Sequence, residues 1–331
     1  MRINQRAQAM SDDASDWIEM NFTVEANYAG WRLDKYLCEK IQRLSRTRVQ
    51  RIIARELVAA RPMKPSTLLT PGLTFQLRRK MLPEPEVPAA DATTEIFRDD
   101  ALYVVNKPAG LPVHPSARYH HGTLVEQIKA RYGDTLRADP AHRLDRETSG
   151  VLVCGQSSEV SRRLMAQFVG GEVKKEYLAV VEGQPPNDAF EVEAAIAEGT
   201  ELIRIAVRID EENGRPAKTR FRVLHRFERD GAKFAVVQCF PETGRQHQIR
   251  IHLQRAGFSL VGDKMYGPDP GYFDRFSKKC LEEEAWVKLR LKRHALHAWR
   301  LSLEHPMTGE TLTFEAPWPD DLREFTGGFV P

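Results

Sequence analysis

Residues 142–150 read HRLDRETSG, and the apolar run VLV at 151–153 follows directly. The apolar run favours a short buried strand, and the Thr-Ser-Gly triplet before it favours a tight polar bend. Asp145 lies at the centre of this bend, with arginines at positions 143 and 146. Such a carboxylate is either a catalytic group or a turn residue that pairs with a neighbouring arginine. For an isolated aspartate the second reading is the more common, because ion pairs usually lie at surfaces.

The sequence around this bend mixes strand and helix patterns. Apolar runs at 101–105 and 177–181 indicate two further short strands. A helix is expected to begin at Ser157 or Ser158 and to end at the two glycines 170 and 171. Its inward face is expected to carry three apolar residues: Val160, Leu164 and Phe168.

The chain has 331 residues, a length that favours two domains. Residues 1–20 are polar and predict a mobile tail. Residues 21–80 form the first predicted domain. Residues 81–94 are rich in proline and poor in apolar residues, which is typical of a linker. The second predicted domain covers residues 95–325.

The first predicted domain begins with an alternating pattern at 21–26 that indicates a strand. A helix is expected next, with four apolar residues on one face: Leu33, Leu37, Ile41 and Leu44. Ser45 is a plausible N-cap for a second helix. The predicted buried stripe of that helix has four members: Val49, Ile52, Ile53 and Leu57.

Positive charge is concentrated in this region. The whole chain has a net charge of +3, whereas residues 31–61 contain nine basic and three acidic residues. The second helix is expected to expose four arginines on one side: Arg46, Arg48, Arg51 and Arg55. Such a basic surface suits the phosphate backbone of a nucleic acid. A solvated helix face or a protein-docking module would have the same pattern.

Composition argues against several other classes of protein. Residues 1–20 do not resemble a secretory signal, and no apolar stretch approaches the roughly 18–20 residues that cross a bilayer. These features predict a soluble cytoplasmic protein. The four cysteines are scattered and are expected to be reduced thiols: Cys38, Cys154, Cys239 and Cys280.

Metal and nucleotide sites are not supported either. Three pairs of histidines are better explained as structural residues than as metal ligands: 120 and 121, 247 and 252, and 294 and 297. The sequence contains neither GxGxxG nor GxxxxGK[ST], so we expect no dinucleotide or ATP site.

The bend at 142–150 is similar to the signature loop of the RluA-type pseudouridine synthases. Four further blocks resemble that family in the same order: DDALYVVNKPAGLPVHP (99–115), KEYLAVVEG (175–183), TGRQHQIRIHLQRAG (243–257) with VGDKMYG (261–267), and RHALHAWRLSLEHP (293–306). In the first domain, RLDKYLCEK, LSRTRVQRIIARELV and PGLTFQL resemble an S4 RNA-binding domain.

The resemblance implies an α+β fold, with a mixed, mostly antiparallel sheet and flanking helices, beside a small S4-like α/β module. It implies an RNA isomerase that converts uridine to pseudouridine in structured RNA, most of all large-subunit ribosomal RNA. It implies no cofactor, and we expect a monomer. The alternatives are the same reaction on transfer RNA and a non-catalytic S4 RNA-binding protein. A glycosidase is a further alternative, but it would normally need a second catalytic acid beside Asp145.

The resemblance also implies roles for five residues. Asp145 is the catalytic carboxylate, which either attacks C1′ or removes a sugar proton to form a glycal. Arg250 is its expected partner, and Arg245 is second choice for that role or a phosphate contact. Tyr177 is expected to stack on the uracil, and assistance by its hydroxyl in removing the C5 proton is the second choice. Arg143 is expected to help push the base out of its stack. The segment around residues 268–285 is longer than the family's minimum, and nothing in the sequence explains it.

Overall fold

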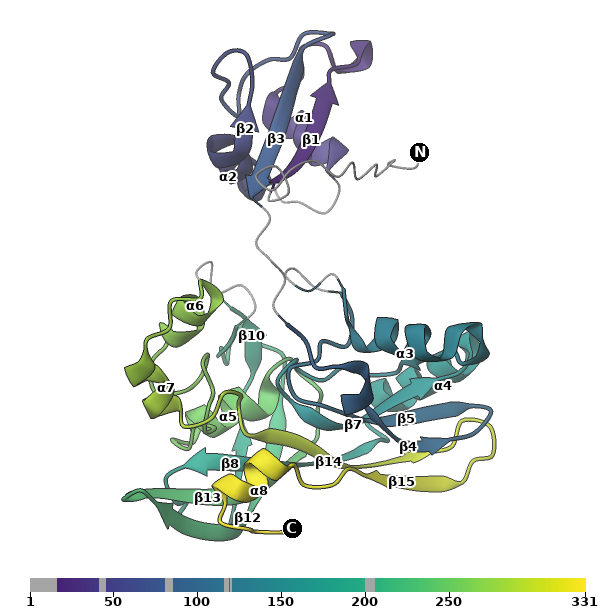
Figure 1. The fold of residues 1–331 in the computed structure, drawn as a ribbon, viewed down its shortest axis with the longest axis vertical. Helices are drawn as coiled ribbons and strands as arrows, with labels where there is room; N and C mark the ends of the chain where they lie inside the picture. The colour runs from purple at the N-terminus through teal and green to yellow at the C-terminus, as the bar shows by residue number, and fades with distance from the viewer. Residues whose placement is uncertain (1–16, 42–45, 81–85, 116–118, 120, 200–205) are drawn as a thin grey trace. The chain divides into compact units, whose positions relative to one another are not determined.

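The structure is a computed structural model that describes residues 17–41, 46–80, 86–115, 119, 121–199 and 206–331. The chain divides into two compact units, residues 1–84 and residues 85–331 (Figure 1). Within the described residues, no helix has the length and apolar character needed to cross a membrane.

Unit 1 is a small antiparallel sheet with two helices. Its strands are β1 (Trp17–Thr23), β2 (Leu57–Val58) and β3 (Thr74–Lys80), in the order β1-β3-β2. Its helices are α1 (Leu33–Lys40) and α2 (Arg46–Glu56), beside the short 3-10 helix η1 (Ala26–Tyr28). Helices and sheet bury a common apolar core, which includes Leu33, Leu37, Val49, Ile53 and Phe75.

Unit 1 differs from its sequence predictions at the first strand and at Leu57, which begins β2 and does not belong to α2. The first strand begins at Trp17 rather than at residue 21, so residues 17–20 belong to the sheet and not to a tail. Strand β1 pairs with the whole of β3, and this pairing extends β1 to residues before the alternating pattern that indicated a strand. Ser45, the predicted N-cap, and Leu44 lie outside the described residues.

Unit 2 is built on a ten-stranded sheet. Its main path runs β4-β5-β7-β14-β8-β13-β12-β9, with β15 paired to β14 and β6 paired to β7. The strands are β4 (Thr94–Arg98), β5 (Leu102–Lys107), β6 (Asp139–Pro140), β7 (Ser149–Gly155), β8 (Lys174–Glu182), β9 (Ala189–Glu193), β12 (Lys218–Arg229), β13 (Ala232–Pro241), β14 (Leu296–Glu304) and β15 (Thr311–Glu315). Strands β10 (Ile196–Glu198) and β11 (Val207–Ile209) form a separate two-stranded antiparallel sheet. Every pairing of the large sheet is antiparallel except that of β7 with β14.

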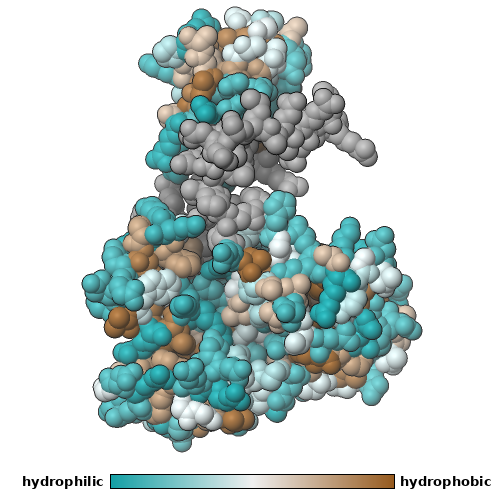
Figure 2. Space-filling model, viewed as in Figure 1, coloured by the Kyte–Doolittle hydropathy of each residue, from teal (hydrophilic) through white to brown (hydrophobic). Residues whose placement is uncertain are grey.

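Helices flank this sheet, as Figure 1 shows. They are α3 (Leu124–Tyr132), α4 (Ser158–Gly170), α5 (Gln248–Arg255), α6 (Tyr272–Ser277), α7 (Glu283–Leu289) and α8 (Asp320–Phe325), with short 3-10 helices η2 (Ala90–Ala92) and η3 (Gly133–Thr135). The mixed, mostly antiparallel sheet with flanking helices confirms the predicted fold class. Hydrophilic residues cover most of the face of unit 2 seen in Figure 2, with small hydrophobic groups between them.

Helix α4 follows the local signals in its sequence. The side chain of Ser157 accepts a hydrogen bond from the Val160 N–H at the start of the helix. Gly171 ends the helix in the left-handed conformation, with φ of 77°. Val160 and Leu164 are buried against β7, with Phe168 packed beside them.

Gly150 is required where β7 meets β14. Its φ is 112°, and a Cβ atom at this position would lie 2.1 Å from the carbonyl oxygen of Ala298. This close approach lets Ser149 and Gly150 pair in parallel with His297 and Ala298. Strand β7 therefore begins at the polar residue Ser149, two residues before the apolar run that predicted it. The loop before β7, which contains Asp145, is thereby held next to the centre of the sheet.

Candidate active site

His142 holds the start of the Asp145 loop, a name we use for residues 142–148. Its Nε2 accepts a hydrogen bond from the Val153 N–H at 3.1 Å, and its ring stacks on Phe168 with centroids 4.6 Å apart. Burial lowers the pKa of His142 to about 3, so the ring is neutral and Nε2 can accept. The stacked, bonded ring joins the loop to both β7 and α4.

Lys107 holds the middle of the same loop. Its side chain is fully buried, and Nζ donates to the carbonyl oxygens of Pro108, Leu111 and Arg146 at 2.8, 2.9 and 3.0 Å. The N–H of Gly110 also donates to the Arg146 oxygen. Burial lowers the pKa of Lys107 to about 7. When the amine is protonated, each of its three N–H donors has a carbonyl partner. The carbonyl group of Arg146, the residue after Asp145, is thus held by two donors, Lys107 Nζ and the Gly110 N–H.

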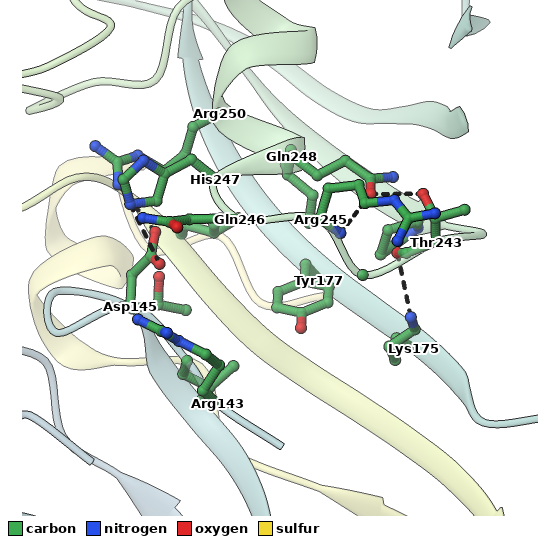
Figure 3. Close-up of a pocket in the computed structure, with 16 residues that line it drawn as sticks. Arg143, Asp145, Lys175, Tyr177, Thr243, Arg245, Gln246, His247, Gln248 and Arg250 are labelled. Atoms are coloured by element: carbon green, nitrogen blue, oxygen red, sulfur yellow. Dashed lines mark hydrogen bonds and ion pairs between the residues drawn. The ribbon is translucent and has the colours of Figure 1, made fainter. Parts of the chain in front are cut away.

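Arg250, drawn beside Asp145 in Figure 3, bridges two carboxylates at the start of helix α5. Its Nη1 donates to Asp145 Oδ2 at 2.9 Å. Its Nε and Nη2 donate to the two oxygens of Asp263 at 2.7 and 2.9 Å. Asp263 Oδ1 also accepts the backbone N–H groups of Met265 and Tyr266. Asp263 thus orients the guanidinium, whose remaining edge meets Asp145.

This arrangement keeps Asp145 ionised. Burial alone would raise the pKa of Asp145, but the positive charge of the neighbouring groups outweighs burial and the pKa falls below its usual value. Among those neighbours, His247 is neutral near pH 7, because burial lowers its pKa to about 4. The permanent charge beside Asp145 is therefore that of Arg250. The Asp145 side chain still exposes 21% of its surface, whereas Asp263 exposes none.

His247 faces the second oxygen of Asp145. Its Nε2 lies 3.6 Å from Oδ1, and its Nδ1 lies 2.9 Å from the hydroxyl of Tyr266. The same hydroxyl accepts the N–H of Val207 at 2.7 Å. His247 has a left-handed backbone conformation, with φ of 54°. Such strain in a non-glycine residue persists only where surrounding contacts enforce it, and it is frequent at functional sites.

A pocket opens beside these groups. Its walls are formed by the Asp145 loop, by Lys175 and Tyr177 of β8, and by residues 241–250. Figure 3 shows Tyr177 in the same pocket as Asp145. Burial, followed by the nearby charge of Asp145, raises the pKa of the Tyr177 hydroxyl far above its usual value. The ring is therefore neutral and presents an aromatic surface inside the pocket.

The other predicted pocket residues occupy different positions. Arg143 is exposed and lines the pocket. Arg245 also lines it, but its Nε donates to the Pro216 oxygen at 3.3 Å. The partner of Asp145 is Arg250, so Arg245 as an alternative partner is wrong. The reason is geometric, because Arg250 lies in the first turn of α5 whereas Arg245 lies in the segment before it.

In unit 1, the predicted arginines of α2 do not all have the same surroundings. All four are exposed: Arg46, Arg48, Arg51 and Arg55. Arg46 Nε, however, donates to Asp34 Oδ2 at 3.0 Å, and the Asp34 side chain is completely buried. Arg32 and Gln50 also donate to Asp34. Arg46 therefore has a structural partner that its position in the sequence did not suggest.

The histidines in the C-terminal blocks make contacts inside the fold. His252 Nδ1 lies 2.9 Å from Thr219 Oγ1, His294 Nε2 lies 2.8 Å from Thr148 Oγ1, and His297 Nδ1 lies 2.9 Å from Ser149 Oγ. In the part of the chain that the structure describes, no cluster of three or more His, Cys, Asp or Glu side chains is arranged to hold a metal ion.

Sequence reasoning missed Asp263 and His247 as members of the site. Both lie inside blocks that were singled out, VGDKMYG and TGRQHQIRIHLQRAG. The available signal was an aspartate between apolar and glycine residues at 261–267, which is unusual for an exposed residue. Nothing in the local pattern of His247 indicated its left-handed backbone.

Comparison with known proteins gives consistent results. Residues 101–255 match the family model described as RNA pseudouridylate synthase. The chain is 35% identical to the ribosomal large subunit pseudouridine synthase D of Nitrosomonas europaea, over 95% of this chain and 88% of that protein. It is 36% identical to the protein of the same name from Neisseria meningitidis, over 92% and 80% of the two chains. The solved structure of human RNA pseudouridylate synthase domain containing 1 is similar, with a TM-score of 0.59 and 25% identity, over 75% of this chain and 91% of that one.

Proposed function

Because this chain belongs to the RluA family of RNA pseudouridine synthases, we propose that it isomerises uridines of large-subunit ribosomal RNA through the carboxylate of Asp145. The relatives named as ribosomal large subunit synthases support this choice of RNA. Their similarity extends over nearly the whole chain, including unit 1. Ribosomal RNA as substrate favours a cytoplasmic enzyme. We also propose that the enzyme acts as a monomer.

One observation carries the proposal for the site. Asp145 binds Arg250 through Oδ2, its Oδ1 lies 3.6 Å from His247 Nε2, and its side chain lines a pocket that Tyr177 also lines. At about 4 Å and an effective dielectric constant near 20, a guanidinium stabilises a carboxylate by about 4 kcal/mol before desolvation is counted. An ionised carboxylate that is partly shielded from water suits attack on a sugar.

The reaction needs such a group. The N1–C1′ bond of the uridine breaks, the base turns, a C5–C1′ bond forms, and the proton on C5 leaves. In one route, Asp145 attacks C1′ and is displaced when C5 attacks the same carbon. In the other, Asp145 removes the sugar proton from C2′ as the N1–C1′ bond breaks, which gives a glycal; C5 then adds to C1′ and the proton returns to C2′. Both routes use an ionised Asp145, and neither requires a cofactor.

Tyr177 and Arg143 complete the proposed site. The ring of Tyr177 would stack on the uracil while it is detached from the sugar. Arg143, exposed beside the pocket, would help to move the base out of its stack, at a cost of a few kcal/mol. Arg245, also in the pocket wall, is a candidate for contact with the RNA backbone.

The function is tested by release of tritium from ribosomal RNA labelled at C5 of uridine. The wild-type protein should release tritium, and Asp145→Asn should lower turnover by roughly 10³-fold or more while RNA binding and thermal stability are kept. Asp320→Asn, which changes an exposed carboxylate, is the matched control. Release at the wild-type rate by Asp145→Asn would refute the role of Asp145. Modification of transfer RNA alone would refute the proposed substrate.

We further propose that unit 1 is an S4-like RNA-binding module that uses the exposed arginines of α2. Replacing Arg48, Arg51 and Arg55 together by glutamine should weaken RNA binding. It should also reduce the slope of log K against log salt by roughly 0.7–0.9 for each RNA phosphate that the protein no longer neutralises. Binding is measured by titration of labelled RNA at several salt concentrations, with Arg323→Gln of unit 2 as the control. An unchanged slope would argue against this part of the proposal.

A further inference from the structure

The segment that the sequence left unexplained forms two short helices. We call residues 268–289 the helical insert; it contains α6 and α7. Tyr272, Ala285 and Leu289 form its own small buried cluster. Arg275 joins its two halves through Asp269 at 2.7 Å and Glu282 at 3.3 Å. The insert therefore has its own internal packing.

Two aromatic side chains of the insert lie against Lys264. The Lys264 Nζ atom is 4.9 Å from the ring centroid of Phe276 and 5.5 Å from that of Trp286. The two rings meet edge to face, with centroids 6.0 Å apart and an interplanar angle of 84°. This is the geometry of a cation–π contact, which is stronger when the cation is removed from water.

Lys264 in turn binds the Asp145 loop. Its Nζ donates to the two oxygens of Glu147 at 3.0 and 3.2 Å and to the carbonyl oxygen of Lys292 at 2.6 Å. The Lys264 side chain is only 3% exposed and that of Glu147 only 13%. An ion pair from which water is excluded is stronger than an exposed one, because the local dielectric constant is lower.

Phe276 also touches the loop from a second direction. The guanidinium of Arg146 lies 5.9 Å from the Phe276 centroid and 5.1 Å from that of Tyr119, to whose hydroxyl it donates. Arg146 Nη2 donates to Glu147 Oε1 at 2.6 Å. One ring of the insert thus contacts both cations that bind Glu147, two residues after Asp145.

We propose that the helical insert supports the Asp145 loop, with Phe276 as a positioning residue that acts through Lys264 and Glu147. The insert closes the outer side of the Lys264–Glu147 ion pair and so fixes the loop that carries the catalytic carboxylate. A misplacement of about 1 Å at a reacting group can lower the rate by about 10²-fold. This inference rests on the proposed function, because its readout is turnover of RNA.

The test separates the cation–π contact from simple apolar packing. Phe276→Leu keeps an apolar side chain but removes the ring, whereas Phe276→Tyr keeps the ring. We expect Phe276→Leu to lower kcat for tritium release by roughly 10-fold with KM within about twofold, and Phe276→Tyr to retain the wild-type kcat. Trp286→Leu, which removes the more distant ring, should give a smaller loss of kcat. Val287→Ala, at an exposed position of the same insert, should have no effect.

A protein that lacks the Lys264–Glu147 ion pair tests whether Phe276 acts through that pair. In a protein that carries both Lys264→Met and Glu147→Gln, adding Phe276→Leu should cause little further loss of kcat. Several results would overturn the proposal: an unchanged kcat in Phe276→Leu, a loss that Phe276→Tyr shares, an effect confined to KM, or the same loss in the protein that lacks the ion pair. An effect confined to KM would instead indicate that the insert contacts RNA. Absence of tritium release by the wild-type protein would be a failure of the proposed function and not of this inference.

Discussion

Asp145 and Asp263 bind the same guanidinium, but their surroundings differ. Asp263 is fully buried and accepts two hydrogen bonds from Arg250 and two from backbone N–H groups. Asp145 accepts one hydrogen bond from Arg250, is partly exposed, and lines a pocket. The saturated carboxylate holds the arginine in place, and the other keeps an oxygen for chemistry. The guanidinium of Arg250 thus binds a structural carboxylate, Asp263, and a reactive carboxylate, Asp145.

The largest effect on stability should follow from removing the charge of the structural carboxylate, Asp263. Asp263→Asn leaves Arg250 buried without its bidentate partner, and breaking a buried ion pair typically costs about 3–5 kcal/mol of stability. We therefore expect a lower free energy of unfolding and a large loss of turnover, both measured on the same preparation. Asp145→Asn should lose turnover but little stability. If the two variants lost stability equally, the distinction between the two carboxylates would be wrong.

A smaller effect is expected on the open side of Asp145, where Tyr177 lines the pocket. Stacking of a base on an aromatic ring contributes about 1–3 kcal/mol. Tyr177→Leu should therefore lower kcat/KM by roughly 10-fold or more, whereas Tyr177→Phe, which keeps the ring, should change it by only a few-fold. Steady-state tritium release measures both. Equal losses of kcat/KM in the two variants would show that Tyr177 acts through its hydroxyl and not through its ring.

The sequence predicted the class of fold and most of the elements that position the site, because these depend on local patterns. Helix α4 matches its prediction, since its N-cap, inner face and terminal glycine are all local signals. The boundaries of β1 and β7 were wrong, because pairing with a neighbouring strand extends each beyond its apolar pattern. The ionic contacts of the loop were the least predictable part.

The ionic contacts of the Asp145 loop were hard to predict because they involve buried charges. Lys107 and Asp263 are both fully buried, although charged residues are expected at the surface. Each is stabilised by partners that only the folded chain brings together, such as the Arg146 carbonyl oxygen 39 residues after Lys107. The resemblance to a family identified Arg250 as a residue of interest, but its second carboxylate partner emerges only from the geometry.

The positive charge beside Asp145, which near pH 7 is that of Arg250, keeps this carboxyl group ionised, and titration of the group measures the effect. The carboxyl ¹³C shift of Asp145 can be assigned from the signal that disappears in Asp145→Asn and followed as the pH is lowered from 7. Because its pKa is held below the ordinary value of 3.8, we expect a titration midpoint below pH 3.8. A midpoint above pH 3.8 would show that burial outweighs the positive charge of Arg250 and of His247, which gains its proton near pH 4, and the proposed electrostatic arrangement would then be wrong.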